Sequence, residues 1–123
     1  MDALIKFTHP EKAYTVEYEF VRRIPRYSLV VDIEMIDIRL EIQIRARTKL
    51  LSLFGCGVDT VKLFPKGTSV RTKLSHRGAE VRALARAVYS SSALGMGIAF
   101  TSVEREDERI LECWIAECLS IPI

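Results

Sequence analysis

The chain has 123 residues, of which 49% are hydrophobic and 28% charged, a composition that excludes a disordered chain and predicts a globular protein. This length corresponds to about one domain, so we expect a single hydrophobic core. The formal net charge of +2 is too small for the basic face of a general nucleic-acid binder, so no nucleic acid polymer is expected as a partner.

Residues 1–21 allow two interpretations, an N-terminal arm or an extra strand. Apolar and polar residues alternate from Tyr14 to Phe20, which is the period of a half-buried strand, whereas Pro10 prevents a long helix. Residues 1–6 lack the basic and apolar regions of a signal peptide, and no apolar run approaches the ~18 residues that span a bilayer. We therefore expect a cytoplasmic protein without membrane insertion, with one domain over residues 22–123.

Alternating side chains predict two long strands after the basic segment at residues 22–27. The first covers residues 29–38, and its apolar face consists of Leu29, Val31, Ile33 and Met35. The second covers residues 40–50, and its apolar face consists of Leu40, Ile42, Ile44, Ala46, Thr48 and Leu50. We expect the two strands to pair, with Asp37 near the bend. Residues 50–58 contain two glycines and are interpreted as a short loop between strands.

Turn signals and further alternation predict a meander in the second half of the chain. Pro65 and Gly67 form a turn that leads into a strand containing Val70, Thr72 and Leu74. Gly78 offers the left-handed conformation of a tight hairpin. The strand after it contains Val81, Ala83, Ala85 and Ala87. In residues 95–100, Gly95, Gly97 and Ala99 alternate with Met96, Ile98 and Phe100. One face of this strand is therefore almost bare backbone, which allows another segment of the chain to approach it closely.

The last segment changes to the period of an amphipathic helix. Its apolar stripe is formed by Ile110, Leu111, Trp114, Ile115 and Cys118. Ser102 is expected as the N-cap, the acidic residues after it favour the helix dipole, and Trp114 is expected to anchor the helix in the core. Five or six short strands followed by one helix predict a mainly β protein, an antiparallel barrel or strongly curved sheet with a helix closing one end.

The sequence gives little support to catalysis. It has no arrangement of serine, histidine and acid, and no glycine-rich loop that opens a helix. The three cysteines, Cys56, Cys113 and Cys118, have no metal-ligand spacing with the two histidines. We therefore expect no enzyme, no metal and no cofactor, and reduced cysteines that act as small apolar residues.

A basic segment, Arg22-Arg23-Ile24-Pro25-Arg26, precedes the first long strand. Pro25 disfavours a helix, so the arginines lie on an extended or turn segment and can spread around an anion. A guanidinium bonds phosphate oxygens in a bidentate way, pairs with the edge of guanine and stacks on a purine ring. Taken alone, the pair Arg22 and Arg26 is a weak signal and is more typical of solvated charges before a strand. The loop at residues 50–58 adds a hydroxyl, Ser52, and exposed backbone donors.

The order and separation of these two segments resembles the PilZ domain family of bacterial cyclic di-GMP receptors. In that family an Arg-x-x-x-Arg motif precedes the first barrel strand, and an Asp/Asn-x-Ser-x-x-Gly motif follows about one strand pair later. Arg22 and Arg26 match the first motif, and Ser52 and Gly55 match the second. The resemblance covers roughly residues 22–118 and implies a six-stranded antiparallel β-barrel with a C-terminal α-helix.

The resemblance also implies a binding site for cyclic di-GMP. Arg22 and Arg26 would clamp the guanines and phosphates, with Arg23 as an auxiliary contact. Ser52 would donate to a phosphate, and Gly55 would let a base approach the backbone. The implied function is a second-messenger receptor that relays its signal to a downstream protein partner through ordering of the arginine segment. The alternative is a PilZ-fold adaptor that no longer binds nucleotide and acts only by protein contact.

One residue departs from the family pattern. Leu50 stands where the family has Asp or Asn, and an aliphatic side chain accepts no hydrogen bond from guanine. Losing one charge-assisted hydrogen bond costs about 1.5 to 3 kcal/mol, roughly tenfold to a hundredfold in affinity. Leu50 also continues the apolar face of the strand at residues 40–50, so a place in the core is a second interpretation of this residue.

Overall fold

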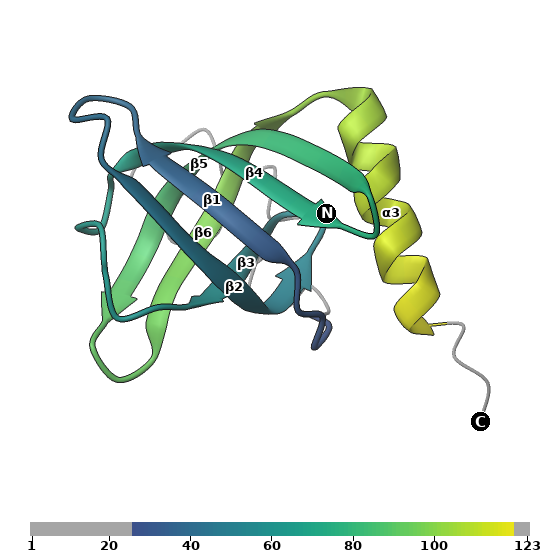
Figure 1. Cartoon of the computed structure of the whole chain (residues 1–123), viewed down its shortest axis with the longest axis horizontal. Helices are drawn as coiled ribbons and strands as arrows, with labels where there is room; N and C mark the ends of the chain where they lie inside the picture. Colours follow the sequence, from purple (N-terminus) through teal and green to yellow (C-terminus); the bar gives the residue numbers. More distant parts are fainter. Residues whose placement is uncertain (1–25, 120–123) are drawn as a thin grey trace, which may run out of the picture.

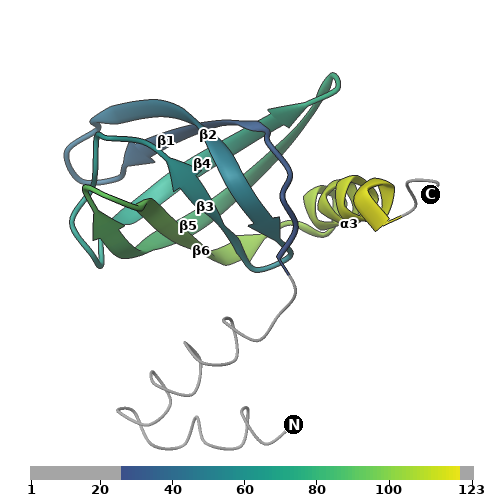
Figure 2. The same cartoon turned by 90° about the horizontal axis from the view of Figure 1, so that it is seen from below.

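Six strands and one helix make up the described part of the chain. The computed structural model describes residues 26–119. In chain order the elements are β1 (Asp32–Asp37), β2 (Gln43–Ser52), β3 (Gly55–Asp59), β4 (Ser69–His76), β5 (Ala79–Ser91), β6 (Gly95–Val103) and α3 (Arg105–Leu119). The strands pair antiparallel and close into a barrel in the order β1-β2-β3-β6-β5-β4 (Figure 1, Figure 2). The predicted six-stranded barrel with a C-terminal helix is confirmed. The predicted arm or strand at residues 1–21 lies outside the described residues.

The two ends of the barrel carry different parts of the chain. Because successive strands run antiparallel, the turns at residues 53–54 and 77–78 lie at one end, and the connections at residues 38–42, 60–68 and 92–94 lie at the other. Helix α3 packs at the first end, opposite the open loops (Figure 1). We call these the helix end and the open end. No helix within residues 26–119 is long and apolar enough to cross a bilayer.

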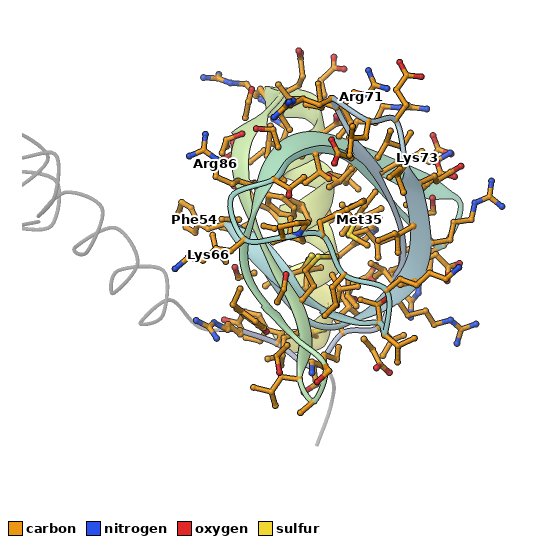
Figure 3. The ribbon with its side chains drawn as sticks, turned by 90° about the vertical axis from the view of Figure 1, so that its left-hand side faces the viewer. Met35, Phe54, Lys66, Arg71, Lys73 and Arg86 are labelled. Carbon is orange, nitrogen blue, oxygen red and sulfur yellow. The ribbon has the colours of Figure 1, made fainter. Side chains whose placement is uncertain are left out.

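The interior is filled by alternate residues of the strands. In Figure 3 Met35 lies inside the barrel, whereas Arg71, Lys73 and Arg86 project outward. The buried residues that the alternation predicted are Val31, Ile33, Met35, Ile44, Val70, Thr72, Leu74, Val81, Ala83, Ala85 and Ala87. The hydroxyl of Thr72 donates to the Ala83 carbonyl at 3.0 Å, so this polar residue is satisfied inside the core.

The bend after β1 corrects the predicted start of the second strand. The Asp37 carboxylate accepts the N–H groups of Arg39 at 2.8 Å and Leu40 at 3.1 Å, an arrangement that stabilises a turn. Leu40 is 65% exposed and Ile42 is 52% exposed, so their predicted place on the buried face is wrong. The alternation in sequence continues into this turn, but β2 starts only at Gln43 because the chain is still reversing direction before it.

Both predicted tight turns are confirmed. In the turn after Phe64, the Thr68 N–H donates to the Pro65 carbonyl at 3.1 Å, and Gly67 has a φ of 94°. In the hairpin between β4 and β5, Gly78 has a φ of 79° and Arg77 a φ of 53°. Two consecutive residues with positive φ match the right-handed twist of the paired strands. The sequence predicted the glycine but not the arginine of this turn.

Residues 55–59 form strand β3 and not the loop that their glycines suggested. The segment pairs with β2 on one side and with residues 96–99 of β6 on the other. A strand without side chains at two positions gains little from propensity. Here both ladders and close packing supply the stability, and the loop shrinks to Leu53 and Phe54.

Helix α3 is confirmed with a later start. Of the predicted apolar stripe, Leu111, Trp114 and Ile115 are buried, whereas Ile110 and Cys118 are half-buried. Trp114 is 4% exposed, with its ring edge-on to His76 at a centroid distance of 5.4 Å. Ser102 is not the N-cap, because β6 continues to Val103 in order to pair with Ala83. The residue before the helix is Glu104, whose carbonyl accepts the Glu108 N–H at 2.8 Å.

The three cysteines are free thiols in different surroundings. Cys56 is buried in the barrel, which fits the predicted role of a small apolar residue, whereas Cys113 is exposed on α3, where that prediction is wrong. Burial raises the pKa of the Cys56 thiol from 9.0 to about 12, because the thiolate would lose its hydration.

We therefore expect iodoacetamide at pH 8 to label Cys113 in the folded protein and to leave Cys56 unmodified, as read by peptide mass spectrometry. The unfolded thiol ionises at a lower pH than the folded one, so its contribution to stability is present below pH 9.0 and is lost toward about pH 12. Labelling in denaturant should modify both cysteines. Equal labelling of both in the folded state would contradict the buried position of Cys56.

Candidate functional site

A short backbone bridge joins the end of the basic segment to the end of β2. Tyr27 and Leu51 exchange two hydrogen bonds, each 2.9 Å between nitrogen and oxygen. Extending this antiparallel pair by one residue puts position 26 opposite position 52. The bridge therefore brings the described end of the basic segment to the end of β2 that carries Ser52, at the helix end of the barrel. Arg22 and Arg23 lie outside the described residues.

Arg26 is exposed and makes no ion pair or hydrogen bond with residues 26–119. Some exposed arginines of the barrel are paired, for example Arg45 with Glu34 at 3.0 Å and Arg82 with Glu80 at 3.2 Å, whereas Arg71 and Arg86 resemble Arg26 in having no ion pair within residues 26–119. A guanidinium without a carboxylate partner keeps its full fork of donors for an anion. The described residues contain no cluster of ligands for a metal ion.

Ser52 is buried and organises the turn between β2 and β3. Its hydroxyl accepts the Phe54 N–H at 3.1 Å and donates to the Gly55 carbonyl at 3.3 Å. The second bond is long and therefore weak. The hydroxyl can exchange the Gly55 carbonyl for a stronger acceptor such as a phosphate oxygen, while the bond from Phe54 keeps the serine in place.

A bulge in β2 decides where Leu50 lies. Thr48 faces the interior, where its hydroxyl accepts the Val31 N–H at 3.0 Å and donates to the Leu29 carbonyl at 2.7 Å. The pairing with β3 shifts between Thr48 and Leu50, so that Leu51, with 0% exposure, takes the next interior position. The interpretation of Leu50 as a core residue is therefore wrong. Leu50 is half-buried on the outer face, two residues from Ser52.

The glycine of the second motif has a structural reason for its identity. A Cβ on Gly55 would lie 2.1 Å from the carbonyl oxygen of Ile98 on the neighbouring strand β6. Two non-bonded atoms cannot approach so closely, so β3 and β6 pair closely only because this position has no side chain. Gly55 holds the start of β3 against β6 and so fixes the turn that carries Ser52.

Two residues beside the motifs escaped the sequence prediction. The Tyr89 ring crosses Gly97, where a Cβ would meet ring carbons at 2.1 to 2.8 Å, and its hydroxyl is 3.6 Å from the Cβ position of Gly57. Lys49 also lies over Gly57 and donates to the Leu94 carbonyl. The bare face of β6 was a signal for a close neighbour, but only the pairing of Tyr89 with Gly97 identifies it.

Together these residues offer two kinds of contact on the outer surface of β2 and β3. At the helix end, Arg26 carries an exposed guanidinium, and Ser52 carries a buried hydroxyl that bonds within the turn. Leu50 and the Tyr89 ring, both within reach of Gly57, supply a half-buried apolar surface against which a flat base can pack. The described part of the site therefore combines a cationic side chain with a half-buried apolar surface, to which Leu50 adds no hydrogen-bonding group.

Comparisons with known proteins identify the family and agree with the fold. A family model described as PilZ domain matches residues 20–117. The chain is similar to the PilZ domain of CeSA from a cellulose-synthesizing bacterium, with a TM-score of 0.61 and 17% identity over 76% of this chain and 96% of that one. It is also similar to the Bacillus subtilis inhibitor of motility MotI/DgrA, with a TM-score of 0.62 and 16% identity over 82% of this chain and 53% of that one. No curated protein sequence matches the chain.

Proposed function

Because the chain belongs to the PilZ domain family, we propose that it is a cytoplasmic bacterial receptor for cyclic di-GMP. The observation that supports the proposal is the bridge between Tyr27 and Leu51, residues that directly follow Arg26 of the first motif and directly precede Ser52 of the second. The two motifs lie 24 residues or more apart in sequence, so this proximity is a property of the fold. It supplies cationic and hydroxyl donors to one ligand.

The proposed roles follow from the chemistry of each side chain. Arg22 and Arg26 hold the phosphates and guanine edges from the arm, and Arg23 is an auxiliary cation. Ser52 donates to a phosphate oxygen after releasing the Gly55 carbonyl. Gly55 keeps β3 and its turn in place, and a base approaches the outer face next to it.

The proposed output is a change at the helix end of the barrel. Arg26 and Tyr27, the described end of the basic segment, lie shortly before β1 and at the same end of the barrel as α3. A ligand that fixes the arm against Ser52 therefore changes the surface beside the helix, which a downstream protein partner can recognise. The proposed protein binds the nucleotide without converting it.

Isothermal titration calorimetry with cyclic di-GMP tests the proposal. We expect saturable heat with the full chain, and nucleotide recovered unchanged by chromatography afterwards. Linear guanosine monophosphate is the matched control ligand, because it lacks the second base and phosphate and should give much weaker heat. Absence of heat at high micromolar cyclic di-GMP would favour the adaptor alternative instead.

Replacing Leu50 by aspartate is expected to raise the affinity for cyclic di-GMP by about tenfold to a hundredfold. The carboxylate would accept hydrogen bonds from the guanine N–H groups that Leu50 leaves without a partner. Since Leu50 lies on the outer face after the bulge, a charge at this position stays hydrated and the barrel should fold normally. Calorimetry on both proteins measures the ratio of dissociation constants.

The control is Leu50→Ala, which removes the same aliphatic surface without adding an acceptor and should not gain affinity. Circular dichroism and thermal melting show whether both variants keep the wild-type fold. If Leu50→Asp bound no more tightly than Leu50→Ala, the missing acceptor would not be the defect of this site.

A further inference from the structure

Part of β2 is paired on one side only, although the barrel is closed. Residues 43–46 pair with β1 along their whole length. Pairing with β3 begins only at Arg47, which faces Asp59, the last residue of β3. Beyond Asp59 the chain turns away at Thr60, whose hydroxyl accepts the Lys62 N–H at 3.0 Å and donates to its carbonyl at 2.9 Å. At the open end, β2 therefore has no neighbouring strand on the side of β3. We call this unpaired side of residues 43–46 the lane.

The hydrogen-bonding groups that face this lane can be identified from the ladder. The N–H of Thr48 donates to Val31, and the Ile42 carbonyl accepts the N–H of Asp37, so even-numbered residues of this part of β2 bond to β1. In an antiparallel ladder the residues in between point their N–H and C=O groups to the opposite side. Gln43 and Arg45 therefore present four backbone groups to the lane, with the two-residue repeat that a strand requires.

The lane is also hollowed and carries apolar and cationic side chains. A groove of about 500 Å³ lies between β2 and the β3–β4 connection, and is lined by Gln43, Ile44, Arg45, Asp59, Thr60, Val61 and Lys62. Val61 is 87% exposed and the nearby Ile42 is 52% exposed. The Lys62 ammonium has no carboxylate partner within residues 26–119. The figures place this connection at the end away from α3 (Figure 1).

We propose that this groove binds an extended segment of a partner protein, which adds to β2 as a short antiparallel strand and carries alternating aliphatic and acidic residues. Backbone groups in a row favour a peptide strand over a small molecule, which would need convergent polar groups. Val61 and Ile42 would contact its aliphatic side chains, and Lys62, which unlike Arg45 has no carboxylate partner within residues 26–119, would contact its acidic ones. This contact goes beyond the nucleotide proposal and does not depend on it.

Hydrogen exchange followed by NMR tests the proposal on the full chain, with the peptide acetyl-Thr-Val-Glu-Val-Glu-Val-Thr-amide as the probe. In the free protein the amides of Gln43 and Arg45 should exchange much faster than those of Ile44 and Ala46, which bond to β1. At saturating peptide the exchange of Gln43 and Arg45 should slow by about tenfold or more, and that of Ile44 and Ala46 should not change. If saturating peptide does not slow the exchange of the Gln43 and Arg45 amides, the proposal is overturned.

Two matched controls distinguish the addition of a strand from nonspecific binding of the peptide. The same peptide with N-methyl groups on both glutamates keeps every side chain but lacks the donors that face β2, so it should not bind. Val61→Ser should weaken the unmodified peptide by about fivefold to tenfold, whereas Val30→Ser, an exposed valine at the helix end, should have no effect. Equal binding of the N-methylated peptide, or equal effects of the two valine variants, would refute the added strand.

Discussion

Replacing Arg26 by alanine is expected to lower the affinity for cyclic di-GMP by about thirtyfold or more. The variant removes a charge-assisted, bidentate contact to phosphate and any stacking of the guanidinium on a base, which together contribute about 2 to 5 kcal/mol. No ion pair within residues 26–119 holds this side chain, so its loss should not affect the fold. Calorimetry measures the affinity, and thermal melting of the same samples measures stability.

Two further variants define what Arg26 supplies. Arg26→Lys keeps the charge but not the planar fork, so an intermediate loss is expected. Arg71→Ala removes an outward arginine from β4 (Figure 3) and is the matched control for net charge. We expect Arg22→Ala to behave like Arg26→Ala. If Arg26→Ala bound as tightly as the wild type and Arg71→Ala did not, the anion site would lie elsewhere on the barrel.

Replacing Gly55 by alanine is expected to destabilise the protein by about 3 kcal/mol, the upper range for an added methyl group in a packed site. The new Cβ would meet the Ile98 carbonyl oxygen at 2.1 Å, and because that neighbour is backbone, β3 and β6 must separate. The Phe54 carbonyl, which accepts the Phe100 N–H at 2.8 Å next to this contact, would move with them. Urea unfolding followed by circular dichroism measures the change.

Gly57 on the same strand is the matched control. A Cβ at Gly57 would find its neighbours at 3.6 to 3.8 Å, which is ordinary contact, and Gly57 does not have a positive φ. Gly57→Ala should therefore leave the free energy of unfolding unchanged or slightly higher, since alanine is less costly than glycine in a strand. If both variants were equally stable, the close approach of β3 to β6 would not constrain the motif glycine.

Much of the fold could be predicted because alternation and turn chemistry agree. Buried residues of β1, β4 and β5 alternate without interruption, and both predicted tight turns contain their glycine. The wrong predictions have physical causes that an alternating sequence pattern does not reveal. Leu40 and Ile42 continue the pattern of β2 while the chain is still turning around Asp37. Strand β3 begins with a glycine because the Ile98 carbonyl of β6 occupies the space of a Cβ at Gly55, and the Tyr89 ring occupies that space at Gly97 of β6.

The candidate site was predicted in its motifs but not in its geometry. Arg26, Ser52 and Gly55 could be named from spacing and resemblance. Only the structure, through the bridge between Tyr27 and Leu51, shows that the ends of the two segments lie close together. The outward position of Leu50 could not be predicted, because a bulge changes the phase of a strand without any change in the apolar pattern. Tyr89 was not found because its partner glycines come from two other strands.

The bulge in β2 also separates the two proposed contacts of this protein. Thr48 fixes the strand to the segment before β1 through three hydrogen bonds, one from its backbone and two through its buried hydroxyl. A longitudinal slip of β2 would break all three, so movement of the arm near Ser52 stops before it reaches Gln43. We therefore expect the peptide groove to be constitutive, equally available with and without nucleotide. In the cell, such a domain would stay attached to its partner and change only what it presents at its other end.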